Sequence, residues 1–482
     1  MEKVLKNLEP KNVFKHFETL TNIPRESGNE KAVSDYIVKF SKDLGLDVIQ
    51  EPSLNVIIKK PATPGYEDKK TVIIQGHMDM VCVKDDDLEF DFQKDPIPLV
   101  IDGDWIKTKG TTLGGDNGIA VAMAMAILED KSIKHPEIKV LLTVGEETGM
   151  DGVLSLNPDN ISGDILINLD SEEEGILLAS CAGGCNNIIT LDLEKREPKK
   201  DTAYKIVLKG LLGGHSGVEI NKRRANAITT LARVLNDLKG EVEFELSEIF
   251  GGDKFNAIPK RAEATLVLNG KDVNTMNKKI NDFQKLLKTE YETSDPNLTI
   301  ELNEVNCPET VYKEEIKESI IKILCLIPDA VQTMSDSIEG LVESSNNLGV
   351  LKEEDEKLIF LNAVRSSVTS LKDNINERIQ IICDLVNADM TIESDYPSWP
   401  FKPESETRDL MKKVYKRLFN KPLKVDAIHA GLECGFLIEK IGDIDMVSLG
   451  PDLFDVHTPN EKLSISSTKR TYDFLIEVLK EI

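Results

Sequence analysis

Histidine and acidic residues stand at the ends of short apolar runs in this chain, or in glycine-containing loops beside them. Loops that follow strands can present side chains without disturbing the packed core. The residues concerned are His77, Asp79, Asp116, Glu146, Glu147, Asp170 and His457. They supply imidazoles, carboxylates and one carboxylate to spare, which is what a pair of metal ions and a neighbouring general base require. The pattern favours a fold in which distant segments converge on one polar site.

The length and the charge of the chain restrict its class. A chain of 482 residues exceeds one ordinary hydrophobic core, so we expect two or three domains. The formal charge is −25, from 59 Lys and Arg against 84 Asp and Glu. An acidic surface repels phosphate backbones and anionic lipids, so neither nucleic acid nor a membrane is an expected partner.

The cysteines and the apolar runs indicate a compartment. The seven cysteines are odd in number and scattered, unlike a secreted disulfide framework. The opening MEKVLKNLEPKNVF lacks the apolar segment of a signal peptide, and the longest apolar stretch, residues 119–128, is too short to cross a bilayer. We therefore expect a cytoplasmic protein.

The first part of the chain alternates between helix and strand patterns. Apolar residues recur at three and four positions in residues 12–23 and 31–45, which predicts two helices. Short β-branched runs predict strands at residues 54–60, 71–77, 138–145 and 164–170, with a helix over residues 118–130. This alternation is typical of an α/β fold with a mixed sheet flanked by helices.

A second domain is expected from residue 186, where apolar and polar residues begin to alternate as in a half-solvated sheet. Its predicted strands are residues 261–270, 298–305 and 357–364, and its predicted helices are residues 224–238, 274–291 and 370–387. Prolines in residues 394–403 suit a linker at its end. The remaining segment again alternates α and β and carries His457, so we expect residues 399–482 to join residues 1–185 in one discontinuous domain, with residues 186–398 as an α+β insertion.

Several candidate residues also have plainer interpretations. His77 with Asp79 fits a metal-bound imidazole oriented by a carboxylate, but an isolated HxD pair is more often structural. Asp116 precedes a helix and could serve as its N-cap. Glu146 and Glu147 repel each other unless one binds metal and the other accepts a proton, and the buried strand before them favours that division.

Two further segments carry expectations of their own. His457 lies in FDVHTPNE, where Pro459 is expected to keep the loop extended and stiff. Cys181 and Cys185, in CAGGC, are interpreted as inert core thiols rather than as a nucleophile or a metal pair.

The motifs GHMDMV, GGDNG, GEETGMDG, LINLD, GGHSG and HTPNE resemble those of the dinuclear zinc family of aminopeptidases, carboxypeptidases, acylases and dipeptidases. The resemblance spans essentially the whole chain, and the long second domain with HAGLECG brings it nearest to the aminoacyl-histidine (Xaa-His) dipeptidase branch. It implies a zinc-peptidase-like α/β catalytic domain, an inserted lid and dimerisation domain, and a homodimer. The activity it implies is metal-dependent hydrolysis of a small peptide substrate.

The resemblance also implies a ligand set for two Zn²⁺ ions per subunit. In similar enzymes the positions of His77 and Asp170 bind one ion. The positions of His457 and Glu147 bind the other, and that of Asp116 bridges both. Oxygen and imidazole ligands also accept Mn²⁺ or Co²⁺, so these ions are alternatives to zinc.

Further roles follow from the same resemblance. Glu146 matches the general base, and Asp79 matches the partner that orients His77. The peptide bond between Asp116 and Asn117 is expected to be cis.

Four further residues, three of them in the expected second domain, match positions that contact the substrate. The match of His215 steadies the oxyanion, in the active site of its own or of the partner subunit. Asn256 and Arg365 match positions that hold the substrate carboxylate, and Gly431 matches a position that offers backbone contacts.

Three alternatives stay open on the sequence. A deacylase or carboxypeptidase of the same family would use the same metal chemistry on another acyl group. A non-catalytic, metal-free scaffold would have no need for the base Glu146. A cysteine hydrolase using Cys181 or Cys434 would need a histidine base that no spacing singles out.

Overall fold

The computed structural model describes residues 3–482, which fold into two compact units. Unit 1 comprises the described residues up to Ser180 together with Trp399–Ala427 and Leu432–Ile482. Unit 2 comprises Cys181–Ser398 and the short segment Ile428–Gly431. The domain borders expected after residues 185 and 398 stay a prediction. The chain passes from unit 1 to unit 2 after residue 180 and returns to unit 1 after residue 398.

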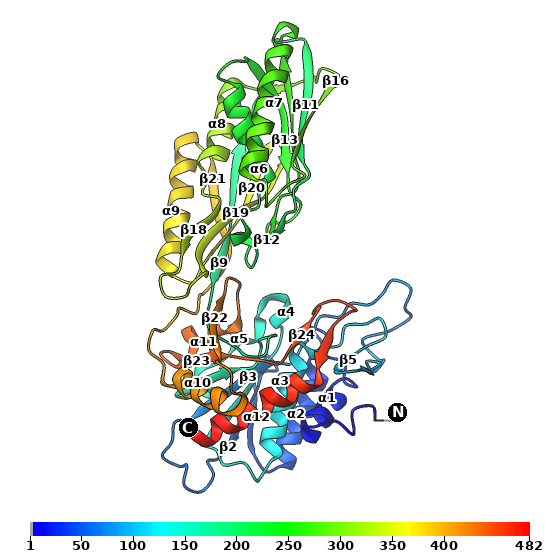
Figure 1. Cartoon of the computed structure of the whole chain (residues 1–482), viewed down its shortest axis with the longest axis vertical. Helices are drawn as coiled ribbons and strands as arrows, with labels where there is room; N and C mark the ends of the chain where they lie inside the picture. Colours follow the sequence, from blue (N-terminus) through cyan, green and yellow to red (C-terminus); the bar gives the residue numbers. More distant parts are fainter. Residues whose placement is uncertain (1–2) are drawn as a thin grey trace. The chain divides into compact units, whose positions relative to one another are not determined.

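Unit 1 is built on a mixed sheet of eight strands in the order β1-β2-β6-β3-β7-β23-β8-β22. Figure 1 labels β2, β3, β22 and β23 of this sheet. The central strand β3 (Val72–His77) pairs in parallel with β6 (Ile138–Thr143) and with β7 (Ile165–Asn168). The other strands are β1 (Asp47–Gln50), β2 (Val56–Lys60), β8 (Ile176–Cys181), β22 (Lys424–Ile428) and β23 (Asp445–Ser448). The parallel strands are runs of buried Val, Ile and Leu, as expected where both faces of a sheet are covered.

Helices cover the sheet of unit 1. They are α1 (Lys11–Leu20), α2 (Lys31–Asp43), α3 (Gly115–Glu129), α10 (Glu406–Phe419), α11 (Glu433–Ile441) and α12 (Ile465–Glu481), with two short helices, α4 (Glu146–Gly149) and α5 (Asp151–Ser155). Helix α3 is apolar on every side because it packs against both α1 and β3. A small sheet joins β24 (Leu453–Phe454), β25 (Lys462–Ser464), β5 (Trp105–Lys107) and β4 (Val100–Asp102).

Unit 2 is built on an antiparallel sheet of nine strands, in which β18 pairs with β19 beside the path β16-β11-β15-β13-β19-β20-β9-β21. Its strands are β9 (Gly183–Asp192), β11 (Thr202–Lys209), β13 (Phe244–Gly251), β15 (Ala262–Leu268), β16 (Thr299–Val305), β18 (Ala330–Met334), β19 (Val342–Glu354), β20 (Lys357–Ser366) and β21 (Asp389–Tyr396). Two short ladders pair β10 (Lys195–Arg196) with β17 (Val311–Tyr312), and β12 (Gly214–His215) with β14 (Ala257–Ile258).

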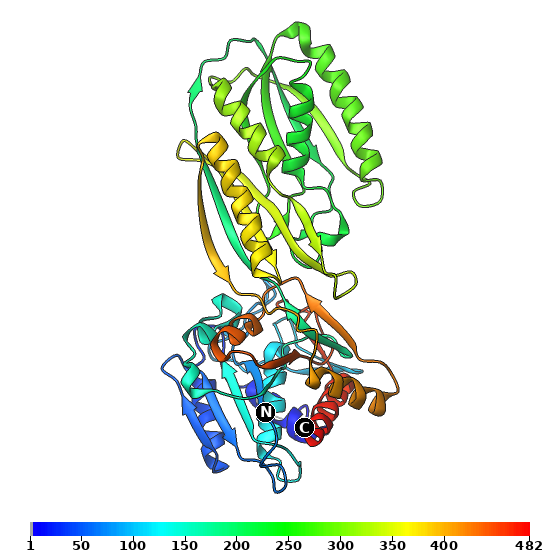
Figure 2. The ribbon, with the colours of Figure 1, turned by 90° about the vertical axis from the view of Figure 1, so that its left-hand side faces the viewer.

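Four helices lie on one face of this sheet, the face turned toward the viewer in Figure 2. They are α6 (Ala227–Leu238), α7 (Val273–Glu290), α8 (Glu314–Leu326) and α9 (Thr369–Val386). Single 3-10 turns lie at Pro158–Asn160, Ile220–Lys222 and Gly270–Asp272. The predicted fold class, an α/β unit with a mixed sheet plus an α+β insertion, is confirmed. Between residues 3 and 482, no helix has the length and apolar character needed to span a bilayer.

Candidate metal centre and a second polar cluster

The candidate residues of unit 1 gather where its parallel strands end. His77 is the last residue of β3, and Asp170 follows β7 by two residues. Glu146 and Glu147 follow β6 and open the short helix α4. Because β3 runs parallel to both neighbours, the carboxyl ends of all three strands meet at one edge of the sheet.

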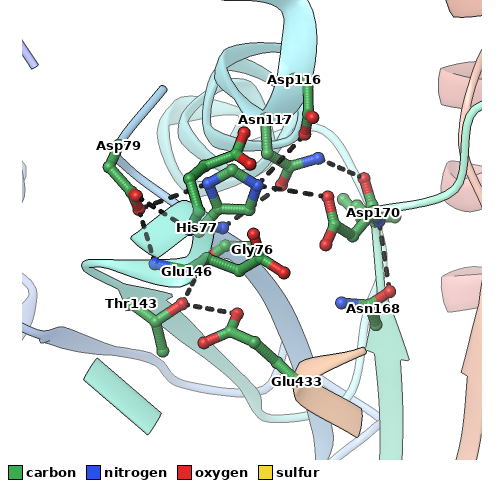
Figure 3. Close-up of polar contacts among 12 residues, drawn as sticks. Gly76, His77, Asp79, Asp116, Asn117, Thr143, Glu146, Asn168, Asp170 and Glu433 are labelled. Carbon is green, nitrogen blue, oxygen red and sulfur yellow. Dashed lines mark hydrogen bonds and ion pairs between the residues drawn. The ribbon is translucent and has the colours of Figure 1, made fainter. Parts of the chain in front are cut away.

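Asp116 lies between two histidines from opposite ends of the chain (Figure 3 shows the first). Its Oδ1 lies 3.1 Å from Nε2 of His77, and its Oδ2 lies 3.0 Å from Nε2 of His457. The same nitrogen of His77 lies 3.4 Å from Oδ1 of Asp170, and that of His457 lies 3.0 Å from Oε1 of Glu147. Each oxygen of Asp116 therefore faces a different histidine, and each histidine faces one further carboxylate.

These contacts define sets of side chains close enough to hold cations. Three groups have ligand atoms that all lie within 4.8 Å of one another, namely His77 with Asp116 and Asp170, His77 with Glu146 and Glu147, and Asp116 with Glu147 and His457. His77, Asp116 and Glu147 each belong to two groups, so the groups share members.

Asp79 is fully buried behind His77. Its Oδ1 lies 3.4 Å from Nδ1 of His77, and its carboxylate accepts the hydroxyl of Ser27 and the backbone N–H groups of Glu146 and Glu147. Burial would raise the pKa of Asp79, but these hydrogen bonds and the charge of His77 lower it to about 2. Asp79 is thus a permanent anion that can fix the orientation of the His77 ring.

Asn117 joins three of the loops around the site. Its Oδ1 accepts the backbone N–H of His77 at 3.3 Å, and its Nδ2 donates to the carbonyl of Leu169 at 3.0 Å. The peptide bond between Asp116 and Asn117 is cis, as expected. Asp116 does not cap helix α3, because its side chain is turned toward the two histidines instead.

The side chains of the cluster carry more negative than positive charge, and bound cations would balance the excess. Burial lowers the pKa of His77, but the carboxylates around it outweigh burial and raise it well above its ordinary value. Hydrogen bonds to Asp116 and Glu147 raise the pKa of His457 to about 10. Burial raises the pKa of Asp170 to about 6, so this acid is hard to ionise without compensation. A cluster with more carboxylates than bases, in which both imidazoles have raised pKa values, fits divalent cations.

Glu146 differs from its neighbour Glu147. Its side chain makes no hydrogen bond to any residue among 3–482, whereas Glu147 faces His457. Burial, with the charges of Asp170 and Glu433, raises the pKa of Glu146 well above its ordinary value. A carboxylate with a raised pKa and no fixed partner is suited to accept a proton.

Glu433 is a buried residue of the site that we did not single out. Its Oε2 accepts hydrogen bonds from Nε2 of Gln75 at 2.6 Å and from the hydroxyl of Thr143 at 2.7 Å (Figure 3). Burial raises its pKa to about 7. The only signal in the sequence was its place in HAGLECG, a motif quoted for Gly431.

The loop of His457 differs from expectation. We expected Pro459 to keep it extended, but residues 456–460 form turns and His457 itself has a φ of 60°, in the left-handed region. The carbonyl of Thr458 accepts the backbone N–H of Glu461 at 3.1 Å. A tight turn, rather than an extended loop, therefore presents the imidazole.

A second polar cluster lies within unit 2 around His215. Its Nδ1 accepts the backbone N–H groups of Gly217 and Val218, at 3.1 and 3.3 Å. Burial and the positive charge of Arg365 lower the pKa of His215, so the ring is neutral near pH 7. Since Nδ1 is an acceptor, the ring carries its proton on Nε2 and can donate one hydrogen bond from that atom.

The other three candidates of unit 2 belong to adjoining segments. The backbone oxygen of Asn256 accepts the N–H of Ser216, which ties its loop to that of His215. Nη1 of Arg365 donates to the hydroxyl of Tyr396 at 2.8 Å. A Cβ at Gly431 would lie 2.9 Å from the ring of Tyr396, so glycine is required there.

His429 completes this cluster and was not among our candidates. It is buried, and its Nε2 lies 2.7 Å from the hydroxyl of Ser345. Burial and the charge of Arg365 lower its pKa to about 3, which makes it a neutral hydrogen-bonding residue.

The cysteines show no sign of nucleophilic chemistry. None of the seven, all of which lie among residues 3–482, forms a disulfide. Cys181 and Cys185 are buried, and burial raises the pKa of the Cys185 thiol, which disfavours the reactive thiolate.

Known proteins match this chain over its full length. Residues 206–295 match the peptidase dimerisation domain of the M20 family. The cytosol non-specific dipeptidase of Escherichia coli is 38% identical over 479 residues, 99% of each chain. The crystal structure of aminoacylhistidine dipeptidase from Vibrio alginolyticus is 37% identical, with a TM-score of 0.96 over 100% of this chain and 98% of that one.

A more distant structure shares the fold. Aminopeptidase PepT from Bacillus cereus is 16% identical, with a TM-score of 0.56 over 98% of this chain and 99% of that one. The full-length relative at 38% identity and the matching domain together identify the family. The chain belongs to the M20 family of metallopeptidases, which are hydrolases.

Proposed function

We propose that this protein is a dinuclear metal dipeptidase that hydrolyses Xaa-His dipeptides. Metal-dependent dipeptide hydrolysis follows from its family and its full-length relatives, and the Xaa-His preference and the two-metal site are the finer parts of the proposal. The observation that carries it is the position of Asp116, whose two carboxylate oxygens face two different histidines. A carboxylate in that position can bridge two cations.

The proposed ligands follow these contacts. His77 and Asp170 would hold one cation, His457 and Glu147 would hold the other, and Asp116 would contribute to both. We infer Zn²⁺ at both positions, with Mn²⁺ or Co²⁺ as alternatives, because imidazole and carboxylate ligands suit all three ions. When bound, such a pair supplies Lewis-acid polarisation of the scissile carbonyl and lowers the pKa of a water molecule.

Glu146 is the proposed general base. Its carboxylate accepts the proton of the attacking water, and its raised pKa favours that step. The same group then returns the proton to the leaving amine, so that peptide cleavage ends with a free amino group. Asp79 holds the His77 ring in one orientation throughout.

The cluster of unit 2 is proposed to bind the substrate. His215 donates from Nε2 to the oxyanion, in the active site of its own or of a partner subunit. The guanidinium fork of Arg365 pairs with the substrate carboxylate, which Asn256 also contacts. Gly431 offers backbone groups next to Tyr396. A homodimer built through the dimerisation domain, in the cytoplasm, is part of the same proposal.

Replacing His215 by alanine tests the oxyanion role. We expect kcat to fall by about 10²–10³-fold, as when one oxyanion donor is lost, with a smaller change in KM. His215→Gln should retain more activity, because a glutamine amide can also donate a hydrogen bond. Steady-state kinetics of both variants is the measurement. A raised KM with unchanged kcat would assign His215 to ground-state binding instead.

Removing and restoring the metal tests the function as a whole. We expect protein stripped with a chelator to lose hydrolysis of Xaa-His dipeptides and to regain it with Zn²⁺, Mn²⁺ or Co²⁺. The panel should include other dipeptides and N-acyl amino acids. Cleavage of N-acyl amino acids alone would favour a deacylase, activity that survives chelation a cysteine hydrolase, and a protein that binds no divalent cation a scaffold.

A further inference from the structure

The loop that carries Asp116 donates backbone hydrogen bonds to a buried carboxylate from the loop that carries His457. Glu461 is 2% exposed, and its side chain accepts four consecutive backbone N–H groups. Oε2 accepts those of Leu113 and Gly114 at 2.7 and 3.0 Å. Oε1 accepts those of Gly115 and Asp116 at 2.8 and 3.3 Å. A carboxylate held by several backbone donors fixes the segment that supplies them.

A buried arginine, Arg25, contacts the same segment by donating a hydrogen bond to one of the segment's backbone carbonyls. Arg25 is 3% exposed and its Nη2 donates to the carbonyl of Gly114. Its Nη1 donates to the carbonyls of Met78 and Asp79, both at 3.0 Å. Arg25 therefore ties the loop after His77 to the loop before Asp116.

These two contacts explain the glycines of LGGDNG. A Cβ at Gly115 would lie 2.7 Å from Leu453 and 3.2 Å from Oε1 of Glu461. A Cβ at Gly118 would lie 2.6 Å from Nη2 of Arg25. Gly114 has a φ of 68°, in the left-handed region. The glycines are thus required by the close approach of Arg25, Leu453 and Glu461.

Glu461 and His457 belong to one tight turn. The hydrogen bonds of Glu461 therefore connect two ligands of the proposed metal centre, His457 and Asp116. Thr458 closes this turn, because its hydroxyl donates to the carbonyl of Asp455 at 2.7 Å and accepts the N–H of Asn460 at 3.2 Å. The turn presents His457 at one end and Glu461 at the other. The segment that donates to Glu461 ends at Asp116, whose Oδ2 lies 3.0 Å from Nε2 of His457.

We propose that Glu461, supported by Arg25, is a positioning residue that holds Asp116 and His457 at the spacing needed to bind a cation. This inference rests on the proposed function. In the proposed function, neither Arg25 nor Glu461 touches the substrate or the reacting atoms. Loss of the hydrogen bonds between Glu461 and residues 113–116 would let the His457 turn move relative to Asp116. The cation held by Asp116, Glu147 and His457 should then bind more weakly than the cation held by His77 and Asp170.

The test is a titration of metal-stripped protein with Zn²⁺ by isothermal calorimetry. Glu461→Gln keeps the size of the side chain but turns an NH₂ group toward backbone donors. Arg25→Lys keeps the charge but loses the two-nitrogen fork, and it serves as a second variant if Glu461→Gln does not fold. The matched control is Glu51→Gln, because Glu51 is a buried carboxylate of unit 1 that accepts the N–H of Asn157 and the amides of Asn55 and Asn160.

Wild type and Glu51→Gln are expected to bind two equivalents with similar constants. In Glu461→Gln, one equivalent should weaken by about tenfold or more, while the other changes by less than about threefold, in line with the 10–100-fold losses seen for residues that support metal ligands. The Co²⁺ spectrum of the substituted protein should change for the same equivalent. In Arg25→Lys both equivalents should weaken, because Arg25 also donates to the carbonyls of Met78 and Asp79 in the loop after His77. Two unchanged constants in a folded Glu461→Gln variant would overturn the inference and leave the proposed function intact. A wild-type protein that binds no pair of cations would overturn both.

Discussion

Glu146→Gln is expected to lower kcat by about 10²–10⁴-fold while the protein keeps its full complement of divalent cations. Glutamine has the size of glutamate but cannot take up a proton at neutral pH. Because no side-chain hydrogen bond joins Glu146 to another residue among 3–482, the exchange leaves the hydrogen bonds of the site in place. The measurements are steady-state hydrolysis of a dipeptide and metal analysis after dialysis.

The adjacent residue provides the matched comparison. Glu147→Gln has the same change in charge and size one position along α4, but it removes an oxygen that lies 3.0 Å from His457. We expect this variant to lose both activity and part of the bound cation. If Glu146→Gln lost the cation and Glu147→Gln kept it, the roles of base and ligand would have to be exchanged, which the group of His77, Glu146 and Glu147 allows geometrically.

The parts of the site that the sequence predicts are those that follow a strong apolar run. Strands β3, β6 and β7 are rich in Val, Ile and Leu, and a polar residue at the end of such a buried strand has few roles other than at a site. Parallel pairing then brings their ends together without any further information. For that reason His77, Glu147 and Asp170 could be expected near one another.

Residues that act through backbone contacts were not predictable in this way. Arg25, Glu433 and Glu461 are charged residues, a type that is mostly exposed in proteins, yet all three are buried. Their partners are backbone groups or, for Glu433, the side chains of Gln75 and Thr143, all far along the chain, and sequence patterns do not report such contacts. Periodicity describes which face of an element is apolar, but it does not show which loop a charged side chain will enter.

The missed elements of unit 2 have a similar cause. We assigned no element to residues 244–251, 314–326 or 342–354, which form β13, α8 and β19. Strand β19 contains the polar stretch ESSNN, typical of a loop, but its asparagines are buried. Nδ2 of Asn347 donates to the carbonyls of Phe255 and Ala257, both at 3.0 Å. Tertiary hydrogen bonds thus stabilise a strand whose local composition disfavours it.

Asp116→Asn is expected to abolish most activity, with kcat/KM lowered by about 10³-fold or more, and to reduce the number of tightly bound cations below two. The bridging role requires both carboxylate oxygens, since Oδ1 faces His77 and Oδ2 faces His457. Asparagine offers one oxygen and a nitrogen that cannot bind a cation. Metal analysis and dipeptide hydrolysis give the two readouts, with Asp87→Asn, an exposed acid of the same unit, as the control.

The cation-free form of this variant gives an independent check on the same geometry. A hydrogen bond to Asp116 is the largest cause that raises the pKa of His457 to about 10. In Asp116→Asn the pKa of His457 should therefore fall toward its ordinary value of 6.5, which NMR titration of the ring would measure. Since a raised histidine pKa stabilises the folded state below pH 6.5 and loses that effect as pH rises to about 10, the cation-free wild type should lose stability over that window more than the variant. An unchanged pKa of His457 in the variant would mean that Asp116 does not face this ring in solution, and the bridging assignment would fall with it.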